Sequence, residues 1–246
     1  MDVRLTRTGH RLIGLAMMMA VSVVIGTVVV AAARNPSQPQ PSPPSPPAAA
    51  AAAPSKPPLP TKYVVLTFDD GPDAAYTPQI LGILAKYEAK ATFFEVGKNV
   101  AKHPELTKRI HDAGHSVQNH TWTHADLRHL SATAFKQQVT ATDQAIRAQI
   151  GSTPGCLRPP YGGVNPTVKQ RAKALGKDLV VWTVDSRDWT RPGTAAVVQR
   201  VMKSVHSGSV ILMHDGGGNR TQTVAALPTI LKSLKAKGYG FRTLSC

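Results

Sequence analysis

Residues 63–72 read Tyr63-Val64-Val65-Leu66-Thr67-Phe68-Asp69-Asp70-Gly71-Pro72, an apolar run that ends at two adjacent carboxylates and a Gly-Pro turn. The run predicts a strand that is buried on both faces, as in a parallel sheet. Neighbouring carboxylates repel each other, and a proton or a cation usually relieves the repulsion. If the strand geometry continues through the pair, Asp69 and Asp70 point to opposite sides and have different roles. We interpret the pair as part of a functional site; the alternative is an Asx-type turn.

A second motif, His120-Thr121-Trp122-Thr123-His124, places two imidazoles at positions i and i+4. In a helix or a tight turn these rings lie on one face and can bind one metal ion. A carboxylate from the aspartate pair would complete a set of two histidines and one aspartate, which leaves coordination positions open as a catalytic metal requires. The predicted ion is zinc, and cobalt or nickel also suits these ligands. The alternative is an ordinary surface pair of histidines.

Short apolar runs alternate with amphipathic segments across residues 61–246. Strands are predicted at 63–67, 91–96, 116–119, 157–159, 179–183, 209–213 and 241–244. Helices are predicted at 78–88, 104–113, 132–150, 166–175, 195–205 and 223–237. Strand–helix alternation predicts an α/β fold with a mainly parallel sheet and outer helices. Seven strand units favour a barrel over a small open sheet.

Polar side chains follow five of the predicted strands, each at the carboxyl end of its strand. They are Asp69 and Asp70, His120 and His124, Arg158 and Tyr161, Asp185 and Asp188, and His214 and Asp215. In a parallel barrel these strand ends share one face, where active sites form. The sequence therefore predicts a single site at this face.

The segment Arg158-Pro159-Pro160-Tyr161-Gly162 is stiff because its prolines fix the backbone. An arginine held beside Asp69 would keep that carboxylate ionised and oriented. The alternative is a Pro-Gly loop with a solvated arginine.

His214 ends the predicted strand 209–213. A lone histidine at a strand end is more often structural than catalytic, but this one shares the face of the other polar clusters. With Asp185 nearby, its pKa would rise towards a value useful for a general acid. Trp189 and Leu212 would give the site apolar walls.

Residues 63–245 resemble the polysaccharide deacetylase domain, which is the NodB-homology domain of carbohydrate esterase family four. The resemblance rests on five motifs in order: Thr67-Phe68-Asp69-Asp70-Gly71, His120-Thr121-Trp122-Thr123-His124, Arg158-Pro159-Pro160-Tyr161, Asp185-Ser186-Arg187-Asp188-Trp189 and Leu212-Met213-His214. It implies a distorted, incomplete (β/α) barrel of about seven parallel strands with outer helices. One departure is Glu95, which stands where the family pattern leads us to expect an apolar residue.

The resemblance also assigns roles to the residues of these motifs. It gives metal binding to three residues, Asp70, His120 and His124. It makes Asp69 the general base, positioned by Arg158. It makes His214 the general acid, tuned by Asp185. Tyr161 would bind the oxyanion through its backbone N–H, and Trp189 and Leu212 would form the pocket for the acetyl methyl group.

The activity implied is metal-dependent removal of N-acetyl groups from N-acetylglucosamine units of a polysaccharide, with release of acetate. Chitin, chitooligosaccharide and peptidoglycan are the candidate substrates. One alternative is an O-acetyl esterase that uses the same site on acetylated xylan. A second alternative, from another class, is a catalytically inactive protein that binds wall glycans; the intact base, acid and metal ligands oppose it.

The first 34 residues have the pattern of an export signal. Arg4, Arg7 and Arg11 precede a nearly continuous apolar run over residues 12–33. The run is longer than the apolar part of a typical signal peptide and long enough to span a bilayer. We expect either a cleaved signal peptide or a signal-anchor, and both place the rest of the chain outside the cytoplasm. The arginines favour an N-terminus inside.

Residues 35–60 contain eleven of the chain's twenty prolines and the alanine run 48–53. Such a segment cannot pack a core and is expected to form a semi-rigid linker. At about 3.1 Å per residue, its reach would be roughly 80 Å. An extracellular domain tethered to the membrane by this linker is one interpretation; a linker without a positional role is the other.

The remaining residues, 61–246, are enough for one domain with a sizeable core. They contain 24 Lys and Arg against 13 Asp and Glu, a net charge of +11. This charge favours anionic partners, whereas the export signal and the lack of a known binding motif argue against nucleic acid. We expect a monomer. Cys156 and Cys246 are predicted to form a disulfide, because paired cysteines in an exported protein are usually bridged.

Overall fold

The computed structural model describes residues 61–244 and residue 246. The predicted export segment, 1–34, lies outside the described residues, as does the predicted linker, 35–60. None of the described helices is long and apolar enough to span a bilayer.

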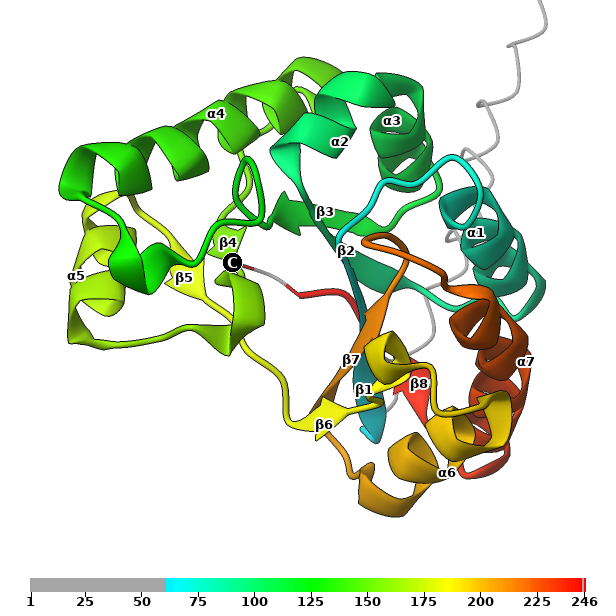
Figure 1. The fold of residues 1–246 in the computed structure, drawn as a ribbon. Helices are drawn as coiled ribbons and strands as arrows, with labels where there is room; N and C mark the ends of the chain where they lie inside the picture. The colour runs from blue at the N-terminus through cyan, green and yellow to red at the C-terminus, as the bar shows by residue number, and fades with distance from the viewer. Residues whose placement is uncertain (1–60, 245) are drawn as a thin grey trace, which may run out of the picture. The chain divides into compact units, whose positions relative to one another are not determined.

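The described strands form one parallel sheet (Figure 1). Their bounds are β1 Tyr63–Asp69, β2 Ala91–Glu95, β3 Ser116–Asn119, β4 Cys156–Leu157, β5 Asp178–Leu179, β6 Val184–Asp185, β7 Ser209–His214 and β8 Gly240–Phe241. Their order is β5-β4-β3-β2-β1-β7-β6, and β8 pairs with the start of β1. β5 and β6 stand at opposite ends of this order, so the predicted incomplete barrel is confirmed as an open half-barrel.

Helices surround the outside of the curved sheet (Figure 1). They are α1 Thr77–Lys86, α2 Gly97–Lys102, α3 Pro104–Asp112, α4 Ala132–Ile150, α5 Pro166–Ala174, α6 Thr194–Ser204 and α7 Thr221–Ala236, with short 3-10 turns η1 Leu127–His129, η2 Pro160–Gly162 and η3 Asp188–Thr190. The six predicted helices match α1 and α3 to α7 within two residues at each end. The short helix α2 is not predicted.

The strand β1 lies at the centre of the core. On one face of β1, Leu66 and Phe68 are 0% exposed, and on the other face Val65 and Thr67 are 5% and 0% exposed, which agrees with a run buried on both faces. α7 covers this core with Leu227, Ile230, Leu231 and Leu234, whose spacing of three and four residues places them on one helix face.

The predicted strand 179–183 is wrong. The segment contains only the end of β5, and β6 begins after it; β5 pairs with β4, whereas β6 pairs with β7. Residues 180–183 therefore connect one edge of the sheet to the other and have no ladder of their own.

The end of the chain is held at the N-terminal ends of the strands. β8 pairs with Tyr63 and Val64, and the Leu244 N–H donates to the Thr92 hydroxyl at the start of β2 (2.9 Å). Cys246 forms the expected disulfide with Cys156, the first residue of β4 (Cα–Cα 5.4 Å). The C-terminal segment thus fastens the side of the sheet opposite the polar clusters.

Candidate active site

The two aspartates of the opening motif differ from the expected strand geometry. β1 ends at Asp69, and Asp70 adopts the left-handed region with φ of 74°. The strand geometry on which opposite orientations depended therefore stops at Asp69, and both carboxylates line one cavity. The turn is fixed because the Asp69 carbonyl accepts from the Asp215 N–H (3.1 Å), and the Asp70 carbonyl accepts from the Asn99 side-chain amide (2.8 Å).

The two histidines of the second motif lie in a tight turn after β3. Thr121 and His124 have φ of 68° and 58°, so the segment is not helical. Its backbone is held from α4, because the Gln138 side-chain oxygen accepts from the N–H groups of Trp122 and Thr123 (2.9 Å each). The turn places both rings near the end of β1.

Asp70, His120 and His124 present ligand atoms that all lie within 4.8 Å of one another. The Asp70 Oδ1 is buried without a hydrogen-bond partner among the described residues, and it lies 3.5 Å from His120 Nε2 and 3.3 Å from His124 Nε2. Burial would raise the pKa of Asp70, but the neighbouring histidines, His120 first, hold it below its usual range. This orphaned oxygen and the two converging nitrogens fit a divalent metal ion.

One histidine of this set has a defined tautomer. His120 Nδ1 lies 2.7 Å from the carbonyl oxygen of Arg158. Because a carbonyl only accepts hydrogen bonds, Nδ1 carries the proton and Nε2 keeps its lone pair for a ligand. Backbone carbonyls commonly orient metal-binding histidines in this way.

The Arg158 guanidinium is buried inside the sheet beside Asp69. It is 0% exposed, and Nη1 donates to Asp69 Oδ1 (2.6 Å) and to the Thr67 hydroxyl (2.7 Å). The guanidinium also stacks on the Phe94 ring at 4.0 Å. Burial lowers the pKa of Arg158, and the Asp69 carboxylate opposes that shift. The predicted pairing of Arg158 with Asp69 is thus present.

His214 lies opposite Asp69, with which it is in register on the neighbouring strand β7. Its Nδ1 is 2.7 Å from Asp188 Oδ1, and Asp188 Oδ2 accepts from the His214 N–H (2.9 Å) and the Thr223 hydroxyl (2.7 Å). Burial would lower the pKa of His214, but the hydrogen bond and charge of Asp188 outweigh it, so the pKa is raised.

The expectation that Asp185 tunes His214 is therefore wrong. Asp185 ends β6, and its Oδ1 accepts from the backbone N–H of Arg187 (2.8 Å). Arg187 has φ of 53°, and this left-handed residue turns the chain so that Asp188 reaches back to His214. Asp185 and Asp188 belong to one sequence motif, so their spacing alone does not show which of them pairs with His214.

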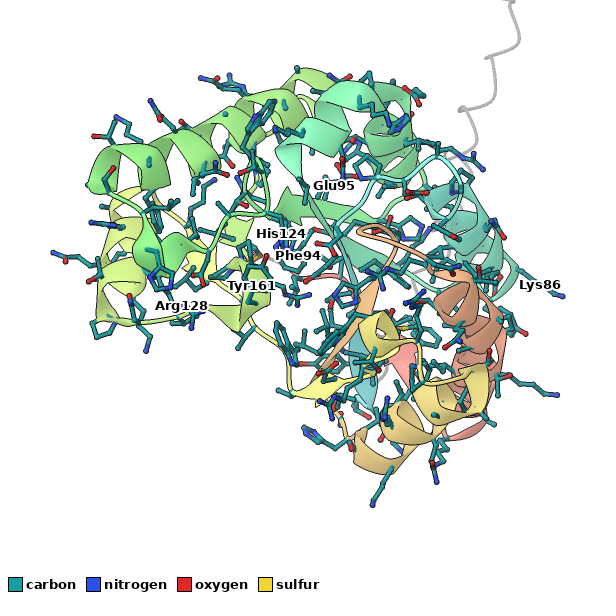
Figure 2. The ribbon with its side chains drawn as sticks, in the orientation of Figure 1. Lys86, Phe94, Glu95, His124, Arg128 and Tyr161 are labelled. Atoms are coloured by element: carbon teal, nitrogen blue, oxygen red, sulfur yellow. A yellow bond between two sulfur atoms is a disulfide. The ribbon has the colours of Figure 1, made fainter. Side chains whose placement is uncertain are left out.

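A cavity of about 390 Å³ joins these groups. Tyr161, Trp189 and Leu212, the three residues predicted to bind substrate, all line it, as do Asp185 and two residues that the sequence did not single out, Trp182 and Arg220. The Tyr161 and Trp189 side chains are 68% and 50% exposed at its margin. Figure 2 shows His124 and Tyr161 side by side, and their ring centroids are 4.7 Å apart. This volume is in the range of small-molecule sites.

Two buried acids, Glu95 and Asp215, have no role assigned by the resemblance. Glu95 (Figure 2), which departs from the family pattern, is 0% exposed and accepts from the Thr107 hydroxyl of α3 (2.7 Å). Burial raises its pKa to about 8, so it is mainly neutral at pH 7. Asp215 accepts from the Thr77 hydroxyl (2.6 Å), and burial raises its pKa to about 7. In each case a threonine hydroxyl donates to the buried carboxyl group.

Comparison with known proteins places this site in a family. The family model for polysaccharide deacetylase matches residues 56–180. A peptidoglycan-N-acetylglucosamine deacetylase of Bacillus cereus is 41% identical over 186 residues, which cover 75% of this chain and 87% of that protein. A chitooligosaccharide deacetylase of Sinorhizobium fredii is 40% identical over 192 residues, covering 74% and 89%.

Solved structures agree with this assignment. The Bc1960 peptidoglycan N-acetylglucosamine deacetylase, in complex with 4-naphthalen-1-yl-N-oxidanyl-benzamide, has a TM-score of 0.72 at 37% identity and covers 74% of this chain and 86% of its own. The chain belongs to the polysaccharide deacetylase family.

Proposed function

We propose that the protein is a metal-dependent hydrolase that removes N-acetyl groups from N-acetylglucosamine units of a polysaccharide and releases acetate. The observation that carries the proposal is a single cavity lined by a candidate base, a candidate acid and a set of candidate metal ligands. Asp69 is held by Arg158, His214 is held by Asp188, and the Asp70, His120 and His124 set lines the same cavity. Base, acid and metal ligands are the groups that hydrolysis of an amide requires.

The ion, proposed as zinc with cobalt or nickel as alternatives, would be bound by Asp70, His120 and His124. When bound, it would supply a Lewis acid for the acetyl carbonyl and lower the pKa of the attacking water.

The chain's own groups perform the proton transfers. Asp69 takes a proton from the attacking water while Arg158 holds the carboxylate in place. The Tyr161 N–H stabilises the negative charge that develops on the carbonyl oxygen. His214 then gives its proton to the departing amine, which leaves glucosamine and acetate. Trp189 and Leu212 surround the acetyl methyl group.

Peptidoglycan and chitin-type chains are the proposed substrates, because the relatives named above act on peptidoglycan and chitooligosaccharide. An exported, monomeric protein, either secreted or tethered to the outer face of the cytoplasmic membrane through residues 12–33, would meet such polymers. An O-acetyl esterase acting on acetylated xylan would need the same groups, and it remains the second candidate because the ester differs only at the leaving oxygen.

The proposal is tested by acetate release from chitotetraose, peptidoglycan and acetylated xylan, with zinc added back to metal-free protein. We expect release from the N-acetylated substrates only when the metal is present. His120→Ala should lose both zinc binding and activity, because it removes a ligand nitrogen. His129→Ala, at an exposed histidine outside the cavity, is the control and should keep both. Turnover by the metal-free protein would contradict the proposal, and release from xylan alone would favour the esterase.

The pairing of His214 with Asp188 predicts a specific pH dependence. A general acid must be protonated, so activity falls as pH rises through the pKa of His214. Because Asp188 raises that pKa, Asp188→Asn should move the alkaline limb of the kcat profile to lower pH. The profiles of Asp188→Asn and Asp185→Asn are compared with that of the unmodified protein. A limb that moves only in Asp185→Asn would show that the structural assignment is wrong.

A further inference from the structure

The glycine-rich segment Gly216-Gly217-Gly218-Asn219-Arg220 follows His214 and Asp215, and the proposed chemistry does not use it. It connects β7 to α7, and Arg220 immediately precedes α7. Arg220 is 5% exposed, although it lines the cavity. Burial of a guanidinium has a cost, so its partners should show what it does there.

The Arg220 side chain holds the glycine turn by hydrogen bonds to the backbone of that turn. Its Nε donates to the Gly216 carbonyl (2.5 Å), and its Nη2 donates to the Gly217 carbonyl (3.0 Å). Within residues 61–244 and 246, no carboxylate forms an ion pair with this guanidinium. Its two bonds to neighbouring carbonyls therefore fix the shape of the turn.

The glycine turn that Arg220 holds packs directly against Asp70. A methyl group at Gly217 would overlap the Asp70 carboxylate, and one at Gly216 would overlap the Asp70 backbone carbonyl. Gly217 also has φ of 69°, a conformation that glycine adopts without strain. The Gly216 N–H completes the contact by donating to the Asp69 carbonyl (3.4 Å).

We propose that Arg220 is a positioning residue for the proposed metal site, because it clamps the turn that backs Asp70. The inference rests on the proposed function, since Asp70 is there a metal ligand. Arg220 fixes Gly216 and Gly217, and Gly217 confines the Asp70 carboxylate against His120 and His124. The carboxylate has a buried oxygen without a partner, so its orientation depends on this packing.

Two pairs of variants test the inference. Arg220→Met removes both hydrogen bonds, and Arg220→Lys can replace only one of them. Gly217→Ala places a methyl group on the Asp70 carboxylate. Gly176→Ala is its matched control, because Gly176 has nearly the same φ (67°) but no atom within 4 Å of the added methyl group, and it lies after α5, outside the cavity. Arg147→Met, at an exposed arginine on α4, controls for loss of charge.

The readout is the affinity of each metal-free protein for Zn²⁺ by calorimetric titration, with the visible spectrum of Co²⁺ as a report on ligand geometry. We expect Arg220→Met and Gly217→Ala to bind Zn²⁺ about 10- to 100-fold more weakly and to alter the Co²⁺ spectrum. Arg220→Lys should fall between Arg220→Met and the unmodified protein. Gly176→Ala and Arg147→Met should match the unmodified protein.

Unchanged Zn²⁺ affinity and Co²⁺ spectrum in both Arg220→Met and Gly217→Ala would overturn the inference, even if acetate release fell. Thermal melting of the metal-free variants identifies any that do not fold, and Gly217→Ala provides the decision if Arg220→Met is one of them. If the unmodified protein binds no Zn²⁺, the proposed metal site itself fails, and the inference fails with it. Zn²⁺ binding without acetate release leaves the positioning role intact and contradicts only the proposed activity.

Discussion

Asparagine in place of Asp69 is expected to lower kcat by about 10²- to 10⁴-fold, the usual contribution of a general base. The amide has almost the same shape, and its oxygen can still accept from Arg158. It cannot take a proton from water, however, so the attack loses its base. Kinetics on chitotetraose measure kcat and KM, and we expect the loss in kcat rather than in KM.

Zinc titration separates this effect from loss of the metal. Asp69→Asn should bind zinc with nearly unchanged affinity, because the proposed ligand is Asp70. Asp112→Asn, on the exposed surface of α3, is the matched control and should be fully active. A near-normal rate in Asp69→Asn would show that another group acts as the base.

Methionine in place of Arg158 is expected to destabilise the domain by about 3–5 kcal/mol. Asp69 is only 3% exposed, so removal of the guanidinium leaves a buried carboxylate without its cation. For a domain of this size, about 2–4 °C of melting temperature is lost per kcal/mol. Urea denaturation and thermal melting measure the change, and activity should be lost as well because the base is no longer held.

A double variant identifies the cause of this loss. Adding Asp69→Asn to Arg158→Met removes the unpaired charge, so the double variant should be more stable than Arg158→Met alone. Arg128→Met breaks an ion pair with Asp126 at the surface (Figure 2), and it should change stability little because exposed pairs contribute little. If the double variant were as unstable as Arg158→Met, lost packing on Phe94 would be the cause.

The sequence predicts a helix or strand correctly where its pattern of apolar residues matches the faces that are buried in the fold. The run ending at Asp69 is apolar because β1 is buried on both faces, and helix α4 has the predicted bounds. At 179–183 the pattern fails, because apolar residues do not reveal which neighbour a segment pairs with. There the chain passes from β5 to β6, at the two ends of the strand order.

The sequence predicts which residues form the candidate site better than it predicts how they are arranged. Residue types and motif order place the acids, histidines and Arg158 at one face. The left-handed turn at Asp70 brings Asp69 and Asp70 into one cavity. The left-handed turn at Arg187 makes Asp188, rather than Asp185, the partner of His214. Neither Asp70 nor Arg187 is a glycine, so the sequence does not show that these two positions adopt the left-handed conformation. Arg220 was missed because its partners are backbone carbonyls.

The position of Cys246 affects how the protein has to be produced. Production in a reducing compartment would leave Cys156 and Cys246 as thiols and open a cross-link between residues 90 positions apart. A cross-link of this span contributes about 4 kcal/mol in the chain-entropy view. A purification tag placed after Cys246 would emerge beside β4, two residues from Arg158. Oxidising expression without a tag after Cys246 therefore gives the reference protein against which the variants should be compared.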